Sequence, residues 1–355
     1  MKRYFQLLFT GIKWLIVSFV FVEILSFLVI TASNYWIYGQ VRDGDPVRYD
    51  PYALFVSETA PRPTVHNPPA PDRAKYRLIW LFGGSTMKGA TDYDDKTIPS
   101  FLARDLNQVE PLLPAYLVNF GEPSFNSLME TKYLEKALIE QPEPPDILIF
   151  YDGANDCAYF AQSRTPYAHH GYRRLRGLIE SYHHSFFGLL KPLNAALYAS
   201  FTHELYDKIR QGVIPLSADD PQLLKFVDTV EKRYDYINRT ALSSGTSFLL
   251  FWQPFWWVET EPVSPAVRQR EEIVVGRHLA MRHNFEVINR ALAARLKDKP
   301  YFIDFRNALC ARTQPAYQAD GIHLQDVGDE MVAGQMARYL KSHWLRTAAV
   351  GGSSR

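Results

Sequence analysis

A hydroxyl side chain and an imidazole stand far apart in the 355-residue chain, each in a short polar segment. Ser85 follows two glycines in the segment GGST at residues 83–86, and His323 follows Asp320 by three residues in the segment DGIH. A serine hydroxyl becomes a good nucleophile when a base within hydrogen-bond reach accepts its proton, and a carboxylate can orient a histidine for that task. These residue types would therefore suit nucleophilic attack on an acyl carbon.

Two more polar segments, NFGEPS at residues 119–124 and DGAND at residues 152–156, hold groups that could bind a developing oxyanion, such as backbone N–H groups and the side-chain amide of Asn155. Each segment also has an ordinary explanation, because Gly, Asn, Asp and Pro dominate turns, a GGST turn can cap a helix or hold phosphate, and DxxH is common. In chain order, however, the four segments supply a hydroxyl, a backbone amide, a side-chain amide and an Asp–His pair, which are the groups that acyl transfer requires.

The elements that would position these segments are short apolar runs, which indicate strands buried on both faces at residues 76–82, 115–120, 146–151, 246–252 and 301–305. Helical periodicity is found at residues 98–107, 128–140, 223–242, 267–296 and 326–344. Strand then helix, repeated, predicts a parallel sheet with right-handed crossovers. The polar segments follow the first, second, third and fifth runs, and ligands bind beyond the carboxyl ends of such strands. We therefore expect the four segments to meet at one edge of the sheet.

The four segments resemble blocks I, II, III and V of the SGNH/GDSL hydrolase superfamily, from roughly the first strand to the last helix. The resemblance implies a three-layer α/β/α fold of the flavodoxin-like type around a five-stranded parallel sheet. It also implies that Ser85 is the nucleophile, His323 the general base and Asp320 the group that orients the imidazole. Block I reads GGST rather than GDS, a variant that resembles membrane-anchored bacterial members.

The same resemblance implies an oxyanion hole made by the backbone N–H of Ser85, the side-chain amide of Asn155 and the backbone of block II. Gly121 matches the first glycine of the family's usual text, NxGxxG, but Ser124 stands at the second glycine. The backbone N–H survives this substitution. If the position requires a positive φ, however, a serine there is strained.

Aromatic residues follow the fourth predicted strand in the segment FWQPFWW at residues 251–257. Gln253, Trp256 and Trp257 are candidates for substrate binding, because aromatic rings could line the cleft and stack on sugars. Burial in the core or against the long insertion described below explains the aromatic residues equally well.

No metal or cofactor is expected. Adjacent histidines at 169–170 and 183–184 would point about 100° apart on a helix, and a serine mechanism needs no metal. The only cysteines, Cys157 and Cys310, lack metal-site spacing; both could lie near the catalytic edge, and whether they form a disulfide is left open.

The composition limits the class of protein and of partner. Hydrophobic residues make up 47% of the chain, which excludes disorder as the main state. With 39 Lys and Arg against 38 Asp and Glu, the net charge of +1 provides no field that would gather polyanions, so we expect no nucleic-acid partner.

The first residues differ in kind from the rest. The run Trp14–Thr31 is apolar apart from Glu23 and is long enough to cross a bilayer. Basic residues at positions 2, 3 and 13 precede it, which predicts a cytoplasmic N-terminus and a body outside. A cleaved signal peptide is the alternative, but the apolar segment is longer than usual for one. Glu23 indicates either a partner or an acid that the helix tolerates, and we favour the second explanation.

We therefore expect an N-terminal transmembrane anchor at residues 1–33, a Pro-rich linker or wrapping segment at 34–75, and an SGNH hydrolase-like domain at 76–346. A helical insertion at about 158–221 is interpreted as a cap beside the sheet, and residues 347–355 as a flexible tail.

Together, these features favour a single-pass protein of the bacterial inner membrane with its catalytic domain in the periplasm or outside the cell. The expected activity is that of a serine esterase that removes O-acyl groups, acetyl groups in particular, from a cell-envelope or extracellular polysaccharide. One alternative is an O-acyltransferase that uses the same triad. Another is a member that binds a glycan or a protein partner without catalysis.

Overall fold

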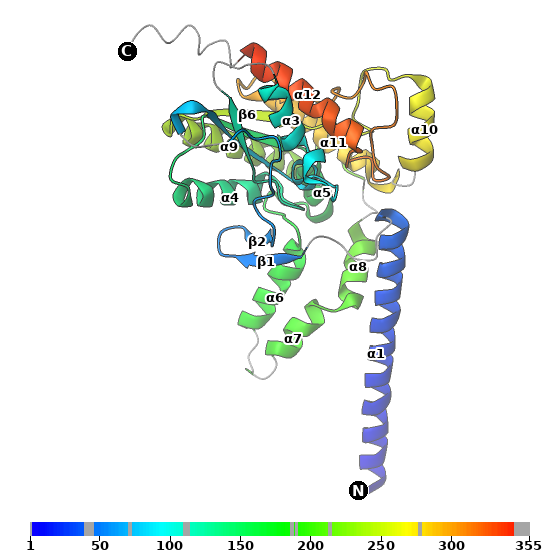
Figure 1. Cartoon of the computed structure of the whole chain (residues 1–355). Coiled ribbons are helices and arrows are strands. Elements are labelled where there is room, and N and C mark those ends of the chain that lie inside the picture. The colour runs from blue at the N-terminus through cyan, green and yellow to red at the C-terminus, as the bar shows by residue number, and fades with distance from the viewer. Residues whose placement is uncertain are drawn as a thin grey trace. The chain divides into compact units, whose positions relative to one another are not determined.

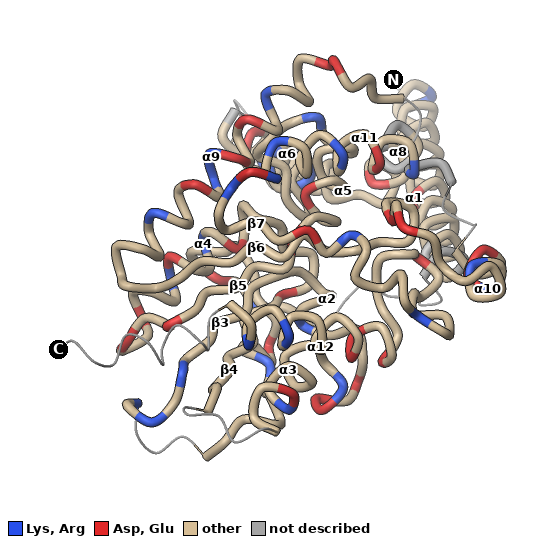
Figure 2. Tube along the Cα trace, turned by 90° about the horizontal axis from the view of Figure 1, so that it is seen from above, with Lys and Arg blue, Asp and Glu red and all other residues tan. Residues whose placement is uncertain are grey.

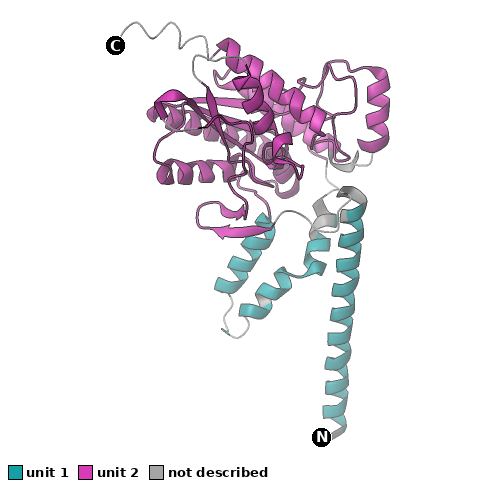
Figure 3. Cartoon of the chain, viewed as in Figure 1, with its two compact units in different colours: residues 1–43, 171–214 teal, residues 44–170, 215–355 magenta. Residues whose placement is uncertain are grey.

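The computed structural model describes residues 2–38, 46–69, 73–108, 114–184, 188, 191–211, 215–275 and 279–343. The chain divides into two units, which are described separately (Figure 3). Unit 1 comprises residues 1–43 and 171–214, and unit 2 comprises residues 44–170 and 215–355.

A five-stranded parallel sheet forms the centre of unit 2 (Figure 1). Its strands are β3 (Arg77–Gly83), β4 (Ala115–Asn119), β5 (Ile147–Asp152), β6 (Ser247–Trp252) and β7 (Phe302–Asp304). They lie in the order β4-β3-β5-β6-β7. Numbered along the chain, this is the 2-1-3-4-5 order of flavodoxin-like sheets, so the predicted fold class and all five predicted strands are confirmed.

The sheet is buried on both faces, as the continuous apolar runs indicated. All six residues of β5 are buried, and side chains of β3 alternate between two core clusters. Trp80 and Phe82 pack into one cluster, and Ile79 and Leu81 pack into the other. Strands covered on both sides bury every position, which is why their sequence shows no period of two.

Helices cover both faces of the sheet. The cluster that holds Ile79 includes α3 (Ile98–Asn107) and α12 (Asp326–His343). The cluster that holds Trp80 includes α4 (Ser127–Glu140), α5 (Ala154–Ser163), α9 (Pro221–Ser243) and α11 (Leu279–Leu296). Short elements complete the unit: α2 (Ser85–Lys88), α10 (Pro265–Val275), and the 3-10 helices η1 (Arg73–Lys75) and η2 (Asp94–Lys96). Over the described trace, acidic and basic residues are interspersed (Figure 2).

Local signals set the helix ends. The Thr97 hydroxyl accepts a hydrogen bond from the N–H of Ser100 and so caps α3, and Asp220 caps α9 just before a proline at its first position. One helix was predicted over residues 267–296, whereas the structure has α10 and α11 there, and residues 276–278 lie outside the described residues.

The segment predicted as a Pro-rich linker or wrapping segment, residues 34–75, contains a hairpin. Strands β1 (Val47–Asp50) and β2 (Leu54–Ser57) pair antiparallel within this segment. The Asp50 carboxylate shapes the turn, because it accepts hydrogen bonds from the N–H groups of Tyr52 and Ala53.

The next part of this segment covers the exposed edge of the sheet. The side-chain amide of Asn67 donates to the carbonyl of Leu117 at 2.7 Å and accepts from its N–H at 2.8 Å, as a neighbouring strand would. Arg62 forms an antiparallel bridge with Asn119. Because β4 is an edge strand, this covering satisfies backbone groups that would otherwise be open to another chain. The wrapping interpretation therefore describes this part of the segment.

Unit 1 consists of α1 (Lys2–Tyr38), α6 (Tyr172–His184), α7 (Lys191–Tyr198) and α8 (Phe201–Gln211). Residues 3–33 of α1 form a helix long and apolar enough to cross a membrane, judged by length and composition. The helical insertion, interpreted from sequence as a cap beside the sheet, groups with α1 over residues 171–214. The physical reason is that α8 packs on α1, with its first two N–H groups bonded to Glu23.

The two cysteines are both free. Cys157 is buried in α5, and the Cys310 thiol donates to the carbonyl of Glu261 at 3.5 Å. The structure thus answers the question that the sequence left open, because neither cysteine is bonded to the other.

Candidate active site

Three of the four polar segments directly follow the carboxyl ends of β3, β4 and β5, whereas DGIH begins at Asp320, further along the chain from the end of β7 at Asp304. Gly83 ends β3, and Ser85 begins α2 two residues later. Gly84 lies so close to block III that a Cβ atom there would stand 2.4 Å from Nδ2 of Asn155 and 3.2 Å from the carbonyl oxygen of Phe125. The glycine before the serine is therefore required by close approach, and it brings segments I and III together.

Ser85, His323 and Asp320 form one hydrogen-bonded chain. Ser85 Oγ lies 2.6 Å from Nε2 of His323, and Nδ1 of the same ring bonds to Oδ2 of Asp320. The other oxygen of Asp320 accepts from the N–H groups of Ile322 and His323, both at 2.9 Å. This turn holds the carboxylate fixed beneath the imidazole, which leaves Nε2 directed at the hydroxyl.

Electrostatic interactions within the site favour the charged forms of Asp320 and His323. Burial alone would raise the pKa of Asp320, but its hydrogen bond and charge interaction with His323, together with two backbone N–H groups, lower that pKa to about 2. Burial would lower the pKa of His323, yet the hydrogen bond and the negative charge of Asp320 raise it above its ordinary value. The arrangement therefore favours the imidazolium form of His323 beside an ionised Asp320.

Block II contains the strain that the sequence suggested. Ser124 has φ +63°, a left-handed conformation that glycine adopts more easily. Its carbonyl accepts a hydrogen bond from the Tyr159 hydroxyl at 3.0 Å. Within the part of the chain that the structure describes, its N–H has no protein acceptor. The position therefore keeps a backbone donor open, at a cost in local conformational energy.

Gly121 differs from the expectation. Its N–H donates to Oδ1 of Asn119 at 2.9 Å, so this donor is already engaged within the loop. A Cβ atom at Gly121 would stand 2.4 Å from the backbone nitrogen of Lys88. The glycine thus allows block II to pack against α2, and among the described residues the N–H of Ser124, unlike that of Gly121, has no protein acceptor.

Asn155 lies in the first turn of α5 and donates through Nδ2 to the carbonyl of Phe125 at 2.5 Å. A primary amide carries two N–H donors, so one remains for an oxyanion. Ser85 N–H is also open, because it stands at the first position of α2, where no intrahelical acceptor exists.

A buried carboxylate that the sequence analysis did not single out ties these loops together. Asp156 accepts from the N–H of Ser127 at 3.0 Å and from its hydroxyl at 2.7 Å. Arg233 donates to the same hydroxyl at 2.7 Å. The start of α4, next to block II, is thereby fixed to the start of α5, next to Asn155. The DGAND segment held the residue, but only the fold reveals its partner.

The proposed substrate-binding aromatic residues lie mostly in the core. Trp256 is 5% exposed, its indole N–H donates to Glu271, and the Arg268 guanidinium stacks on its ring at 3.9 Å. Gln253 is also buried, whereas Trp257 is half-buried and its ring lies against Gly321. Because the indole N–H of Trp256 is bonded inside the fold, the structure favours the core explanation for this residue. Substrate contact by Gln253 and Trp257 stays a prediction.

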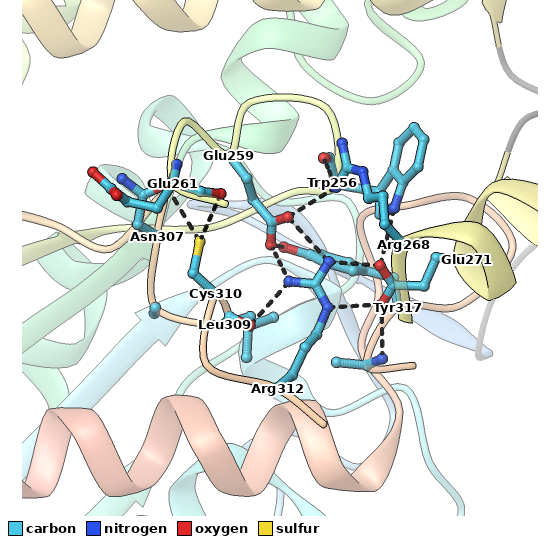
Figure 4. Close-up of polar contacts among 12 residues, drawn as sticks. Trp256, Glu259, Glu261, Arg268, Glu271, Asn307, Leu309, Cys310, Arg312 and Tyr317 are labelled. Carbon is cyan, nitrogen blue, oxygen red and sulfur yellow. Dashed lines mark hydrogen bonds and ion pairs between the residues drawn. The ribbon is translucent and has the colours of Figure 1, made fainter. Parts of the chain in front are cut away.

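A buried ion-pair network lies next to this tryptophan (Figure 4). The fully buried Arg312 guanidinium binds two carboxylates, those of Glu259 and Glu271. Glu259 also accepts from the Tyr317 hydroxyl at 2.7 Å, and Glu271 accepts from the N–H of Ala316 at 3.1 Å.

This network fixes the loop that carries Asp320 and His323. It anchors residues 316–317 a few positions before Asp320, and the carbonyl of Gly321 accepts from the N–H of Trp256 at 2.9 Å. Sequence reasoning missed the network, because its members are single charged residues spread over 259–317 with no motif.

No group of three or more His, Cys, Asp or Glu residues that could hold a metal ion occurs among the described residues. His169 forms a hydrogen bond to the carbonyl of its neighbour, His170.

No family model matches the chain, and no curated protein matches it. Several solved structures, however, are similar to the chain. An aryl esterase of M. smegmatis is 16% identical, with 75% of this chain and 99% of that chain covered and a TM-score of 0.38. The acetyl xylan esterase AlAXEase is 14% identical, with coverages of 74% and 99% and a TM-score of 0.40. A lipolytic protein of the G-D-S-L family from Veillonella parvula DSM 2008 is 12% identical, with coverages of 75% and 99% and a TM-score of 0.41.

Proposed function

We propose that the chain is a membrane-anchored serine esterase of the SGNH type. One observation carries the proposal: Ser85 Oγ lies 2.6 Å from Nε2 of His323, whose other nitrogen bonds to Asp320. A hydroxyl, an imidazole and a carboxylate in this order form the arrangement that activates a serine.

The proposed reaction begins with attack by Ser85 Oγ on the ester carbonyl, while its proton passes to Nε2 of His323. The tetrahedral oxyanion would accept hydrogen bonds from the N–H of Ser85, the N–H of Ser124 and Nδ2 of Asn155. The leaving alcohol then takes the proton from His323, and an acyl-serine ester remains.

Water completes the cycle. It gives a proton to His323 and attacks the acyl-serine, and collapse of the second tetrahedral species returns the proton to Ser85 Oγ and releases the acid. Asp320 stays ionised throughout, in keeping with a pKa of about 2, and stabilises the imidazolium in both halves.

The proposed substrate is an O-acylated polysaccharide of the cell envelope or the cell exterior, with acetyl as the acyl group. The membrane anchor supports this proposal, because α1 has the length and composition of a membrane-spanning helix and basic residues at its start. In this arrangement the N-terminus is cytoplasmic, and unit 2 faces the periplasm or the exterior.

A hydrolysis assay tests the activity. The full chain in detergent is given p-nitrophenyl acetate, and the wild-type chain is compared with Ser85→Ala and with Ser342→Ala, a control on the exposed side of α12. We expect Ser85→Ala to lose at least about a thousand-fold in kcat, since removal of the nucleophile abolishes the covalent route, while Ser342→Ala keeps wild-type activity. Equal activity of wild type and folded Ser85→Ala would overturn the assignment.

A further inference from the structure

Helices α6, α7 and α8 carry apolar side chains that point outward within unit 1. Six of them are between 48% and 66% exposed: Ile179, Tyr182, Leu193, Leu197, Tyr206 and Ile209. A helix in water normally turns such residues toward a core, so a concentration of them on three consecutive helices indicates an apolar environment.

The first turn of α8 contacts α1 at Glu23, within the apolar run of α1. Oε2 and Oε1 of Glu23 accept from the N–H groups of Phe201 at 2.9 Å and Thr202 at 3.1 Å. The rings of Phe27 and Phe201 meet edge to face, with centroids 5.0 Å apart. Because Glu23 lies near the middle of Trp14–Thr31, the start of α8 lies beside residues that a bilayer would enclose.

The contact at Glu23 has a physical reason in lipid. A carboxylate placed among acyl chains is costly unless donors satisfy it. The first turn of a helix presents unbonded N–H groups and the positive end of its dipole. The start of α8 therefore supplies what Glu23 lacks on an isolated membrane helix, and the interpretation of Glu23 as a tolerated acid without a partner is wrong.

Helices α6 and α7 join α8 as one structure. Gly177 of α6 lies so near Tyr198 of α7 that a Cβ atom would stand 2.4 Å from its ring. Arg174 donates to the carbonyl of Ala199 at 3.0 Å, just beyond the end of α7. The rings of Tyr198 and His203 meet edge to face, which links α7 to α8. In Figure 3, these helices lie at the level of the C-terminal half of α1.

The composition of α6 suits the boundary between lipid and water. Its sequence, YRRLRGLIESYHH, combines three arginines with apolar and aromatic residues. Helices of this type rest in the headgroup region, with apolar side chains toward the acyl chains and arginines toward phosphates.

We propose that α6, α7 and α8 lie in the lipid bilayer, in the leaflet that holds the C-terminal half of α1. The proposal rests on the membrane anchor of the proposed function. Lipid is the occupant that the contacts favour, because α8 is joined to α1 at Glu23 and Phe27, within the apolar run of α1. The protein would then be anchored in the membrane by four helices rather than one.

Spin labels on the full chain test this proposal. The chain is reconstituted in nanodiscs of phosphatidylcholine and phosphatidylglycerol, in a Cys310→Ser background, since Cys157 is fully buried. Single cysteines replace Leu28 in α1, Leu197 in α7 or Leu242 in α9, all of which are 48% to 60% exposed. A fourth variant, Ile209→Cys in α8, provides a second probe if Leu197→Cys fails to fold.

The measured quantity is the accessibility of each nitroxide to oxygen, which concentrates in lipid, relative to a water-soluble nickel chelate. We expect the logarithm of this ratio to be positive at Leu28, Leu197 and Ile209 and negative at Leu242. A positive value at Leu28 with negative values at Leu197 and Ile209 overturns the proposal and leaves the anchor intact. Labels at Leu197 and Ile209 shielded from both reagents also overturn it, because a protein partner then covers the helices. A negative value at Leu28 overturns the anchor and the proposal together.

Discussion

Substitution of Arg312 tests how far the buried ion-pair network next to the site contributes to stability and to activity. The Arg312 guanidinium is 0% exposed and binds Glu259 and Glu271, each of which is 1% exposed. The change Arg312→Met keeps much of the volume but removes the charge. Glu271 then keeps only two neutral donors, the N–H of Ala316 and the indole N–H of Trp256, and is left as a buried carboxylate without a cation. Glu259 keeps its ion pair with Arg268, whose side chain is 29% exposed.

The expected cost follows from the burial of these groups. Removal of one partner from a buried ion pair costs about 3–5 kcal/mol, because the remaining charge stays out of water. For a domain of this size, that loss lowers the melting temperature by on the order of 10 °C. We expect kcat to fall by roughly ten- to a hundred-fold in the folded variant, because the loop before Asp320 is no longer anchored and the imidazole shifts.

Arg306→Met is the matched control. Arg306 pairs with Asp304, but these side chains are 23% and 40% exposed, so the pair contributes about 1 kcal/mol or less. Melting of both variants is followed by circular dichroism, and kcat is measured with p-nitrophenyl acetate below the lower transition. A melting temperature for Arg312→Met no lower than that of Arg306→Met would show that the buried network does not stabilise the fold.

Three further predictions concern the site itself. Because the pKa of His323 is raised and the neutral imidazole is the base, kcat/KM should increase with pH through an apparent pKa above about 6.5, and Asp320→Asn should move this pKa down; a pH–rate profile of both forms checks this. Asn155→Ala should lower kcat by about a hundred- to a thousand-fold with little change in KM, as steady-state kinetics would show. Ser124→Gly should leave kcat within about two-fold and stabilise the fold by about 0.5–1 kcal/mol in urea unfolding, because it relieves the positive φ and keeps the N–H.

The sheet and the meeting of Ser85, His323 and Asp320 could be predicted because their signals are local. Each buried strand is a continuous apolar run, and GGST and DGIH each place a reactive residue directly at a strand end or turn. The possible strain at Ser124 was also readable, since a serine stood where the resembled family has a glycine. Such features depend on neighbouring residues, so the sequence alone contains them.

The remainder depends on contacts between distant residues. Nothing in the sequence indicates that Glu271 and Arg312 meet, or that Asp156 holds the start of α4. The same limit explains the placement of α8, because Glu23 and Phe201 are 178 residues apart and neither belongs to a motif. The engagement of Gly121 N–H likewise follows from the side chain of Asn119, whose direction only the folded loop reveals.

The most direct measurement of the central claim is the site of a covalent adduct. The full chain is treated with a fluorophosphonate, digested and analysed by mass spectrometry, alongside His323→Ala. We expect one phosphonylated peptide, with the adduct on Ser85, and labelling of His323→Ala slowed by at least about a hundred-fold. An unmodified Ser85 in the folded wild-type chain, or equal labelling rates with and without His323, would contradict the claim.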